Sequence, residues 1–458
     1  GLKASGTRRP RRGSRSLLMS SPSPTPTPDT AVGLRRSLRP VDLVALGINA
    51  VIGTGIFFLP GYVAADLGPA AVLTFLLSAV LCSLLVLCFA EVSSRFQGTG
   101  GALLYSTAAF GSTVGFGVGW LGWIARLATW GALANALVDS LGTLVPGAPD
   151  QRATILTLIF LGFGIVNLAG VRQAALLTNV ITVGKLLPLV LFIGVGLFFM
   201  DFSLLEPFAP HGYAPIGAST LVILFAFVGF ETLPVPAGES LDPRRDMPRA
   251  LILSMSIITS IYLLVWLVCA TTLPTLAGSE TPVSDAAAQF MGPVGLTVVN
   301  LGILLSVFGV NSATALITPR YLYALAERKT IPSVFGWLHA NRRTPVVAIL
   351  VTYTAAWLLA MTGTFVELAV LSVLARFGEY IPTCLALPRL RKLRPDDRGF
   401  RLPMGTPVSL LAVGVCVWLL TQAEPRQLVT GAVALGVGLL LHLPMRRRGD
   451  TDPGPDLR

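Results

Sequence analysis

Two apolar segments of this chain are each interrupted by a short glycine-containing run. The first run is Ile52-Gly53-Thr54-Gly55-Ile56-Phe57, and the second is Phe225-Ala226-Phe227-Val228-Gly229-Phe230-Glu231. Inside a bilayer, non-helical backbone is tolerated only where protein or a cavity surrounds it, because lipid cannot satisfy the freed N–H and C=O groups. Matching interruptions in the two halves of a many-helix chain therefore predict a binding site of the kind that secondary transporters use.

Several charged residues also fall within apolar segments. Lys185 lies in mid-segment, where a lysine costs roughly 2.5–3.5 kcal/mol on insertion scales. Burial favours its neutral form, so it could exchange a proton during a cycle. It could equally be a permanently charged strut that bonds the carbonyls of the first interrupted helix. Arg376 and Glu379 are three residues apart on a predicted helix and could satisfy each other.

The elements that must position these residues are predicted from composition and hydropathy. The chain has 458 residues, of which 53 % are hydrophobic and 12 % charged, and its mean hydropathy is +0.73. A soluble domain carries about twice that charged fraction, and a membrane span needs roughly 20 mostly apolar residues. We therefore predict an all-α polytopic membrane protein with twelve spans: 41–65, 69–95, 111–141, 153–171, 175–200, 217–237, 249–275, 292–320, 345–363, 365–388, 406–423 and 427–445.

The basic residues predict the orientation of these spans. With an internal N-terminus, all but five of the 34 Lys and Arg residues lie in internal segments or at their edges. The exceptions are Arg126, Lys185 and Arg376 within spans, and Arg152 and Arg426 outside. The positive-inside rule therefore places both termini in the cytoplasm. It also explains the net charge of +11 without a nucleic-acid partner.

Other site chemistries find little support in the sequence. The five cysteines lie in predicted spans without C-x-x-C spacing, which indicates buried small hydrophobic residues and neither disulfides nor a metal site. The run Gly115-Phe116-Gly117-Val118-Gly119 lacks the strand context of a nucleotide-binding loop. No cluster of His, Asp or Ser suggests an enzyme, and we expect no cofactor.

The two ends of the chain have a different composition. Residues 1–40 are rich in Arg, Ser and Pro, which predicts a disordered basic cytoplasmic tail. This tail lacks the apolar core of a signal peptide, and Met19 is the expected start of translation. Residues 446–458 are expected to form a short cytoplasmic tail. The segment between the tails, 41–445, is the predicted transmembrane domain.

The motifs resemble those of the amino acid–polyamine–organocation (APC) superfamily of permeases. The first interruption resembles its Gly-Ser/Thr-Gly-Ile-Phe signature, and the second its aromatic-x-Phe-x-Gly-x-Glu segment. The resemblance covers roughly residues 39–400. Two loops add further matches: Glu239, Pro243, Pro248, Arg249 and Ala250 in one, and Arg320, Tyr323, Ala324, Glu327, Arg328, Pro332, Thr344 and Pro345 in the other.

This resemblance implies a fold and an activity. The fold is a 5+5 inverted repeat with broken helices 1 and 6, a LeuT-like arrangement. Repeat one would span 41–200 and repeat two 217–388, with two peripheral helices over 406–445. The activity is secondary transport of amino acids or related amines in the cell membrane. The partners implied are the substrate and the lipid bilayer, and the sequence does not specify an oligomeric state.

The resemblance also suggests how an amino acid would bind. The helix restarting after the first interruption offers N–H groups, those of Thr54 and Gly55, to a carboxylate, and Gly53 allows close backbone approach. Carbonyls near Val51, Ile52, Phe225 and Val228 would suit the ammonium group. Phe225 occupies the position of an aromatic gate, with Phe227 nearby, and Gly229 belongs to the second interruption. Alternatively, Gly53 and Gly55 serve only close helix packing.

Three charged residues acquire expected roles from the same resemblance. The resemblance implies that Lys185 corresponds to a lysine that is linked to proton coupling in some members of the family. It also implies that Glu231 corresponds to an acidic residue that stabilises the second interruption or senses pH. Arg126 could contact the substrate side chain, or pair with Glu231 or Glu379. We expect proton symport of a neutral amino acid; an obligate amino acid or amine exchanger and a non-transporting sensor are the alternatives.

Overall fold

The computed structural model describes Gly1 and residues 39–449, apart from 97–100, 143, 144, 146, 170–173, 236, 238, 239, 340–343 and 396–398. Most of the predicted N-terminal tail and the end of the C-terminal tail, with Met19 and Glu239, lie outside the described residues. The described part of the chain from residue 39 onward is helical. Its helices are α1 (Pro40–Val51), α2 (Gly55–Leu67), η1 (Gly68–Ala71), α3 (Val72–Ser94), α4 (Gly101–Phe110), α5 (Ser112–Gly142), η2 (Pro149–Gln151), α6 (Arg152–Ala169), α7 (Ala174–Gly196), η3 (Phe202–Leu205), α8 (Ile216–Phe227), η4 (Phe230–Thr232), α9 (Pro243–Thr272), α10 (Pro282–Glu327), η6 (Ser333–Gly336), α11 (Val346–Thr362), α12 (Phe365–Leu393), α13 (Gly405–Leu420) and α14 (Pro425–Gly449).

Local signals in the sequence explain several helix ends. Pro40 occupies the first position of α1, where its missing N–H costs no hydrogen bond. The Asp42 carboxylate there accepts the Arg39 N–H at 2.9 Å. At the start of α12, Thr364 and Glu367 form a reciprocal capping box. These caps fix where the two helices begin.

The helical stretches have the length and composition of membrane spans. Seven helical stretches of the described residues are long and apolar enough to cross a bilayer. Six further apolar stretches have 10–17 described residues. The interrupted helices α1 and α8 belong to this shorter class because the breaks cut them short. In the most apolar stretch of α6 only 17 % is buried inside the protein, and in that of α14 only 11 %. Such apolar surface suits lipid, so the chain forms a multi-pass membrane protein.

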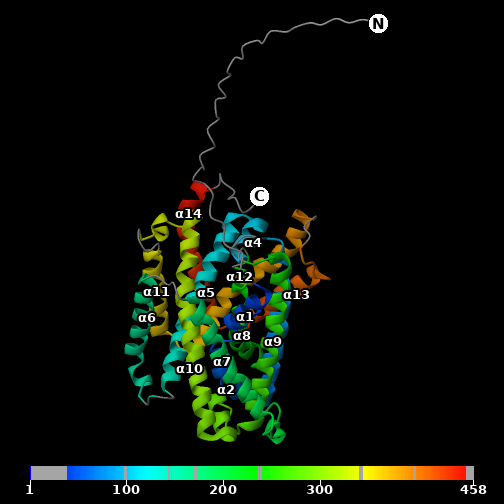
Figure 1. Cartoon of the computed structure of the whole chain (residues 1–458), viewed down its shortest axis with the longest axis vertical. Coiled ribbons are helices and arrows are strands. Elements are labelled where there is room, and N and C mark those ends of the chain that lie inside the picture. The colour runs from blue at the N-terminus through cyan, green and yellow to red at the C-terminus, as the bar shows by residue number, and fades with distance from the viewer. Residues whose placement is uncertain are drawn as a thin grey trace. The chain divides into compact units, whose positions relative to one another are not determined.

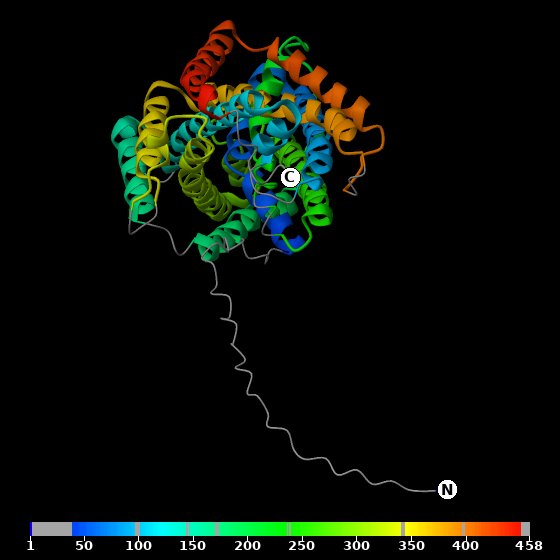
Figure 2. The same ribbon diagram turned by 90° about the horizontal axis from the view of Figure 1, so that it is seen from above.

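The interrupted helices lie inside the bundle. α1 packs against α9, α2 against α8, and α3 against both α8 and α9, while α5 packs against α10 and α12. Figure 1 shows α1 and α8 in the middle of the bundle, with α6 and α11 on one side and α13 on the other. The view from above gives the same order (Figure 2). All five cysteines are buried and unpaired, which confirms their interpretation as small core residues.

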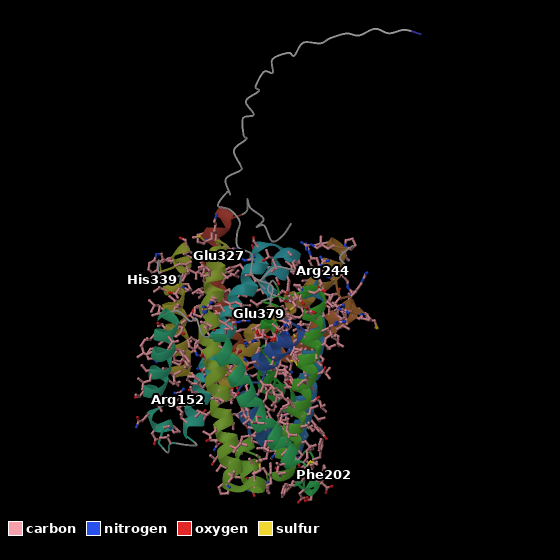
Figure 3. The ribbon with its side chains drawn as sticks, in the orientation of Figure 1. Arg152, Phe202, Arg244, Glu327, His339 and Glu379 are labelled. Carbon is pink, nitrogen blue, oxygen red and sulfur yellow. The ribbon has the colours of Figure 1, made fainter. Side chains whose placement is uncertain are left out.

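Labelled residues from three connections lie at the two ends of the bundle. Glu327, His339 and Arg244, which belong to segments predicted to be internal, lie toward one end (Figure 3). Phe202, from a segment predicted to be external, lies at the opposite end. Glu379 lies between these levels, within the depth of the bundle.

The structure differs from the predicted elements at three places. α4 is a ten-residue helix in a segment predicted as a connection; at about 15 Å it is too short to span a bilayer. The sixth predicted span reaches residue 237, but α8 ends at Phe227 and only η4 and turns follow among the described residues. Pro234 in this stretch lacks the N–H that a helix needs. Finally, α10 begins at Pro282 and changes direction at Gly292, whose φ of 63° suits glycine.

Candidate functional site

The first interruption leaves backbone donors free. α1 ends at Val51, Ile52 has ψ of 98°, and α2 begins at Gly55. The Phe57 N–H bonds the Thr54 carbonyl at 3.0 Å, whereas the N–H groups of Gly53, Thr54 and Gly55 have no acceptor among the described residues. The Thr54 hydroxyl is also buried and has no hydrogen-bond partner in the described part of the chain. Four hydrogen-bonding groups are therefore available at one helix N-terminus, where the helix dipole favours an anion.

The second interruption is held by Glu231. α8 ends at Phe227, and Val228 is extended with ψ of 157°. Gly229 has φ of 120°, a conformation that favours glycine. Its N–H donates to Glu231 Oε2 at 2.9 Å, and its carbonyl accepts the Thr232 hydroxyl at 2.6 Å. Glu231 thus caps the unwound segment, which is one of the two roles expected for it.

The two interruptions pack against each other through their glycines. A Cβ on Gly55 would lie 2.7 Å from Ala226 Cα, at the end of α8. Conversely, a Cβ on Gly229 would lie 2.2 Å from the Ala50 carbonyl oxygen, at the end of α1. Real Cβ atoms do not approach so closely, so each glycine permits the approach of the other interrupted helix.

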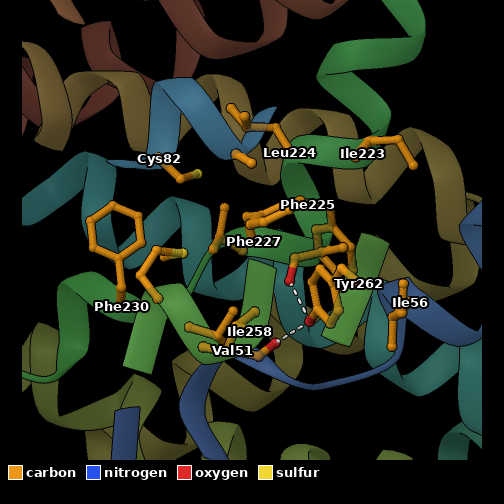
Figure 4. Close-up of a cluster of buried hydrophobic side chains, with 14 of the residues drawn as sticks. Val51, Ile56, Cys82, Ile223, Leu224, Phe225, Phe227, Phe230, Ile258 and Tyr262 are labelled. Atoms are coloured by element: carbon orange, nitrogen blue, oxygen red, sulfur yellow. Dashed lines mark hydrogen bonds between the residues drawn. The ribbon is translucent and has the colours of Figure 1, made fainter. Parts of the chain in front are cut away.

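Tyr262 of α9 joins the two interruptions. Its hydroxyl lies within hydrogen-bond distance of the Val51 carbonyl, at 3.3 Å, and of the Ala226 carbonyl, at 2.9 Å (Figure 4). The ring packs edge-on against Phe227 at 5.0 Å. Sequence reasoning missed Tyr262; the available signal was a tyrosine in an apolar span, whose hydroxyl needs a partner when buried.

We predict that Tyr262→Phe lowers the initial rate of substrate uptake about tenfold. The variant keeps the ring but removes the hydroxyl, whose single proton is shared between a carbonyl of each interruption. Such a hydrogen bond is worth about 0.5–1.5 kcal/mol. Uptake into vesicles at saturating substrate measures the effect. Tyr213→Phe is the matched control, because Tyr213 is 56 % exposed in the connection before α8. Equal rates for both variants would contradict a role for Tyr262 in holding the site.

Lys185 supports the end of α1. Its ammonium group donates to the carbonyls of Asn49 and Ile52 at 2.8 and 2.7 Å, and the residue is fully buried. No ion pair to Lys185 exists among the described residues. The ammonium therefore lies at the negative end of the α1 dipole. This geometry fits the strut and leaves proton exchange open, because loss of the proton would release these carbonyls.

Four charged side chains form a buried cluster beside the second interruption. Glu231 Oε1 lies 2.8 Å from Arg376 Nε and 3.9 Å from Arg126 Nη2. Arg126 Nη1 lies 2.7 Å from Glu379 Oε1, and the Tyr380 hydroxyl donates to Glu231 Oε2 at 3.1 Å. Arg126 therefore pairs as the sequence allowed. The predicted pair of Arg376 with Glu379 is wrong, because each of these residues bonds a partner from another helix.

A cavity of about 1100 Å³ adjoins both interruptions. Of the predicted binding residues it is lined by Val51, Gly53, Thr54, Gly55, Arg126, Phe225, Val228 and Gly229. Ser312 and Thr314 of α10 add polar groups to its wall. The cavity extends to Glu327 and Arg328, which are exposed at the end of the bundle marked by Glu327 in Figure 3.

Ile52 and Phe227 do not line this cavity, so the structure does not bring them together with the other predicted binding residues. The Ile52 side chain is fully buried and its carbonyl accepts from Lys185. Phe227 packs on Tyr262. The Val51 carbonyl is bonded to Tyr262, so of the four carbonyls expected to bind an ammonium only those of Phe225 and Val228 have no donor among the described residues.

An aromatic cluster lies on the α2 side of the interruptions. The Phe365 ring, at the start of α12, contacts the rings of Phe225 and Phe58 edge-on at 5.7 and 5.8 Å. Phe225 also lines the cavity. It therefore belongs to both the cavity wall and this cluster.

Comparisons with known proteins show which family the chain matches. Residues 38–433 match the family described as amino acid permease. The branched-chain amino acid permease BcaP of Bacillus subtilis (strain 168) is 27 % identical over 440 residues, covering 91 % of this chain and 94 % of that protein. The methylthioribose transporter of the same organism is 27 % identical over 442 residues, with the same coverage. The serine/threonine exchanger SteT, also from this organism, is 27 % identical over 432 residues, covering 90 % and 95 %.

Proposed function

Because the chain belongs to the amino acid permease family, we propose that it moves a neutral α-amino acid across the cell membrane by proton-coupled symport and alternating access. The observation that carries this proposal is the cavity between two interrupted helices. On its wall lie N–H groups and the Thr54 hydroxyl, which have no partner within the residues that the structure describes. Non-helical backbone at this depth is expected only where it serves such a site.

The proposed binding mode follows from the free backbone groups. The substrate carboxylate accepts from the N–H groups of Thr54 and Gly55 and from the Thr54 hydroxyl. Its ammonium group donates to the Phe225 and Val228 carbonyls. Phe225 lies over the bound molecule on the side of the aromatic cluster. An α-amino acid carries both charges at a fixed separation, so it can bridge the two interruptions as no simple amine or acid can.

The proposed architecture has twelve spans arranged as a 5+5 inverted repeat with two peripheral helices, and both termini in the cytoplasm. The reciprocal packing of Gly55 and Gly229 supports it, because equivalent positions in two related halves would face each other in this way. The cavity then opens to the cytoplasmic end, where Glu327 and Arg328 lie. This is an inward-facing state in which Phe58, Phe225 and Phe365 close the external path.

Proton coupling is assigned to Lys185. Protonated, it holds the end of α1 through two carbonyls; neutral, it would hold them more weakly and let the interrupted helix shift. The driving force is sufficient, since one charge crossing the membrane gains about 2.3 kcal/mol per 100 mV. Glu231 is fully engaged by Gly229, Arg376 and Tyr380, so we give it the capping role.

Obligate exchange is the second candidate, and the similarity to a serine/threonine exchanger favours it. The same cavity serves both modes. They differ in whether the empty carrier can change conformation, which uptake measurements separate. A sensor that binds without transport is the remaining alternative.

Uptake into proteoliposomes tests the proposal. We expect one or more labelled neutral amino acids to accumulate in empty vesicles, and an inward proton gradient to raise the rate at least several-fold. Uptake only into preloaded vesicles would identify an exchanger instead. Uptake of methylthioribose, a neutral sugar thioether, without any amino acid would overturn the proposed substrate class.

A further inference from the structure

The wall of the cavity has an uneven charge distribution. Among the described residues, its charged lining residues are four arginines and one glutamate: Arg126, Arg320, Arg328, Arg376 and Glu327. Glu327 lies at the exposed mouth. The two carboxylates that neutralise the inner arginines, Glu231 and Glu379, do not line the cavity. At the depth of the interrupted helices, the cavity therefore faces guanidinium groups, with the carboxylates behind them.

Arg126 is the arginine best placed to meet a substrate side chain. It comes from the middle of α5 and is linked to the second interruption through Glu231, which bonds the Gly229 N–H. Its guanidinium carbon lies 3.8 Å from the centroid of the Tyr321 ring, which fixes the plane of the group. Arg126 is 4 % exposed, and its Nε has no partner among the described residues.

The contacts of Arg126 favour repulsion of cations over binding of anions. Nη1 is already bonded to the Glu379 carboxylate and to the Gly122 carbonyl at 2.8 Å. A cationic side chain that entered this part of the cavity would meet the guanidinium group first, with the carboxylates that pair with it farther away, so the nearer like charge would oppose its approach. It could not reach Glu379, because Arg126 occupies that position.

We propose that Arg126 is a specificity-determining residue that excludes amino acids with cationic side chains. This inference rests on the proposed function, since it names the substrate class that the site rejects. Arg126 fills the position where a lysine or arginine substrate would need a carboxylate. Glu379 is that carboxylate, held in an ion pair with the protein's own cation.

The first test needs no variant. Norleucine and lysine have side chains with the same four-carbon chain and differ by the terminal ammonium group. We expect norleucine to inhibit uptake of a labelled neutral amino acid by the wild-type protein, and lysine to inhibit at least a hundredfold more weakly. Equal inhibition by the two compounds would overturn the inference. Absence of uptake for every amino acid would instead overturn the proposed function.

The second test assigns the exclusion to Arg126. In Arg126→Gln, Glu379 loses its partner, and we expect the ratio of the lysine to the norleucine inhibition constant to fall at least tenfold. Arg126→Lys keeps the charge and should keep the ratio. Arg328→Gln removes a positive charge at the exposed mouth and is the matched control, for which the ratio should not change. An unchanged ratio in Arg126→Gln would overturn the assignment.

A folding defect would not leave the inference untested. Thermal stabilisation of the purified Arg126→Gln protein by lysine and by norleucine gives the same ratio without transport. If this variant does not fold, the wild-type comparison still decides whether cations are excluded. The double variant Arg126→Gln/Glu379→Gln, which has no unpaired charge at this place, should lose the lysine binding that the single variant gains.

Discussion

Gly55→Ala is expected to weaken substrate binding about ten- to a hundredfold. The added Cβ would lie 2.7 Å from Ala226 Cα and 2.8 Å from its Cβ, so α2 and α8 must separate. Overpacking of this kind costs about 1–3 kcal/mol. The displaced groups are the Gly55 and Thr54 N–H donors on one side and the Phe225 carbonyl on the other. Binding of a labelled amino acid to the purified variant measures the loss directly.

The control separates a local effect from a general glycine effect. A Cβ added to Gly162, in α6, would meet no neighbouring atom within 4 Å. Gly162→Ala should therefore bind and transport like the wild type, and both variants should elute as folded monodisperse protein in detergent. Wild-type affinity in a folded Gly55→Ala protein would contradict the binding mode proposed for the first interruption.

Lys185→Ala is expected to remove the dependence of uptake on a proton gradient. The change deletes the cation at the end of α1 and leaves the carbonyls of Asn49 and Ile52 without this donor. An unsatisfied buried group costs about 1–3 kcal/mol, so the uptake rate should also fall. Uptake is compared with and without an inward proton gradient at equal membrane potential. Unchanged stimulation by the gradient would exclude Lys185 as the coupling residue.

Lys185→Arg distinguishes coupling from support. The guanidinium group can donate to both carbonyls but does not lose its proton in proteins. If Lys185 both supports α1 and exchanges the proton, the arginine variant should still bind substrate. It should exchange external labelled substrate for substrate inside preloaded vesicles, and this exchange should not respond to the proton gradient. If it retains a normal gradient response, the lysine acts only as a strut and the proton is carried elsewhere.

The positions of the interruptions were predictable from the sequence. The run Gly53-Thr54-Gly55 marked the first break, and the helix ends at Val51 and resumes at Gly55. Gly229 marked the second, where its φ of 120° disfavours other residues. These signals are local, because backbone freedom depends on the residue itself. The apolar segments were predictable because hydropathy is also a property of the residues themselves.

The partner of Arg376 was not predictable. Spacing on α12 suggested that Arg376 would pair with Glu379, yet Arg376 bonds Glu231, and Glu379 bonds Arg126. Such pairs depend on which helices meet, and no spacing along one helix encodes that. The contacts of the Tyr262 hydroxyl with the two interrupted helices are of the same long-range kind. α4 was missed because ten residues of ordinary apolar sequence carry little helical signal.

The central claim is that both charged groups of an α-amino acid bind between the two interruptions. The most direct test is competition on purified wild-type protein, using a labelled amino acid against the same amino acid, its decarboxylated amine and its N-acetyl derivative. We predict that both derivatives compete at least a hundredfold more weakly than the amino acid. An amine that competes as well as the parent compound would contradict the carboxylate site at Thr54 and Gly55.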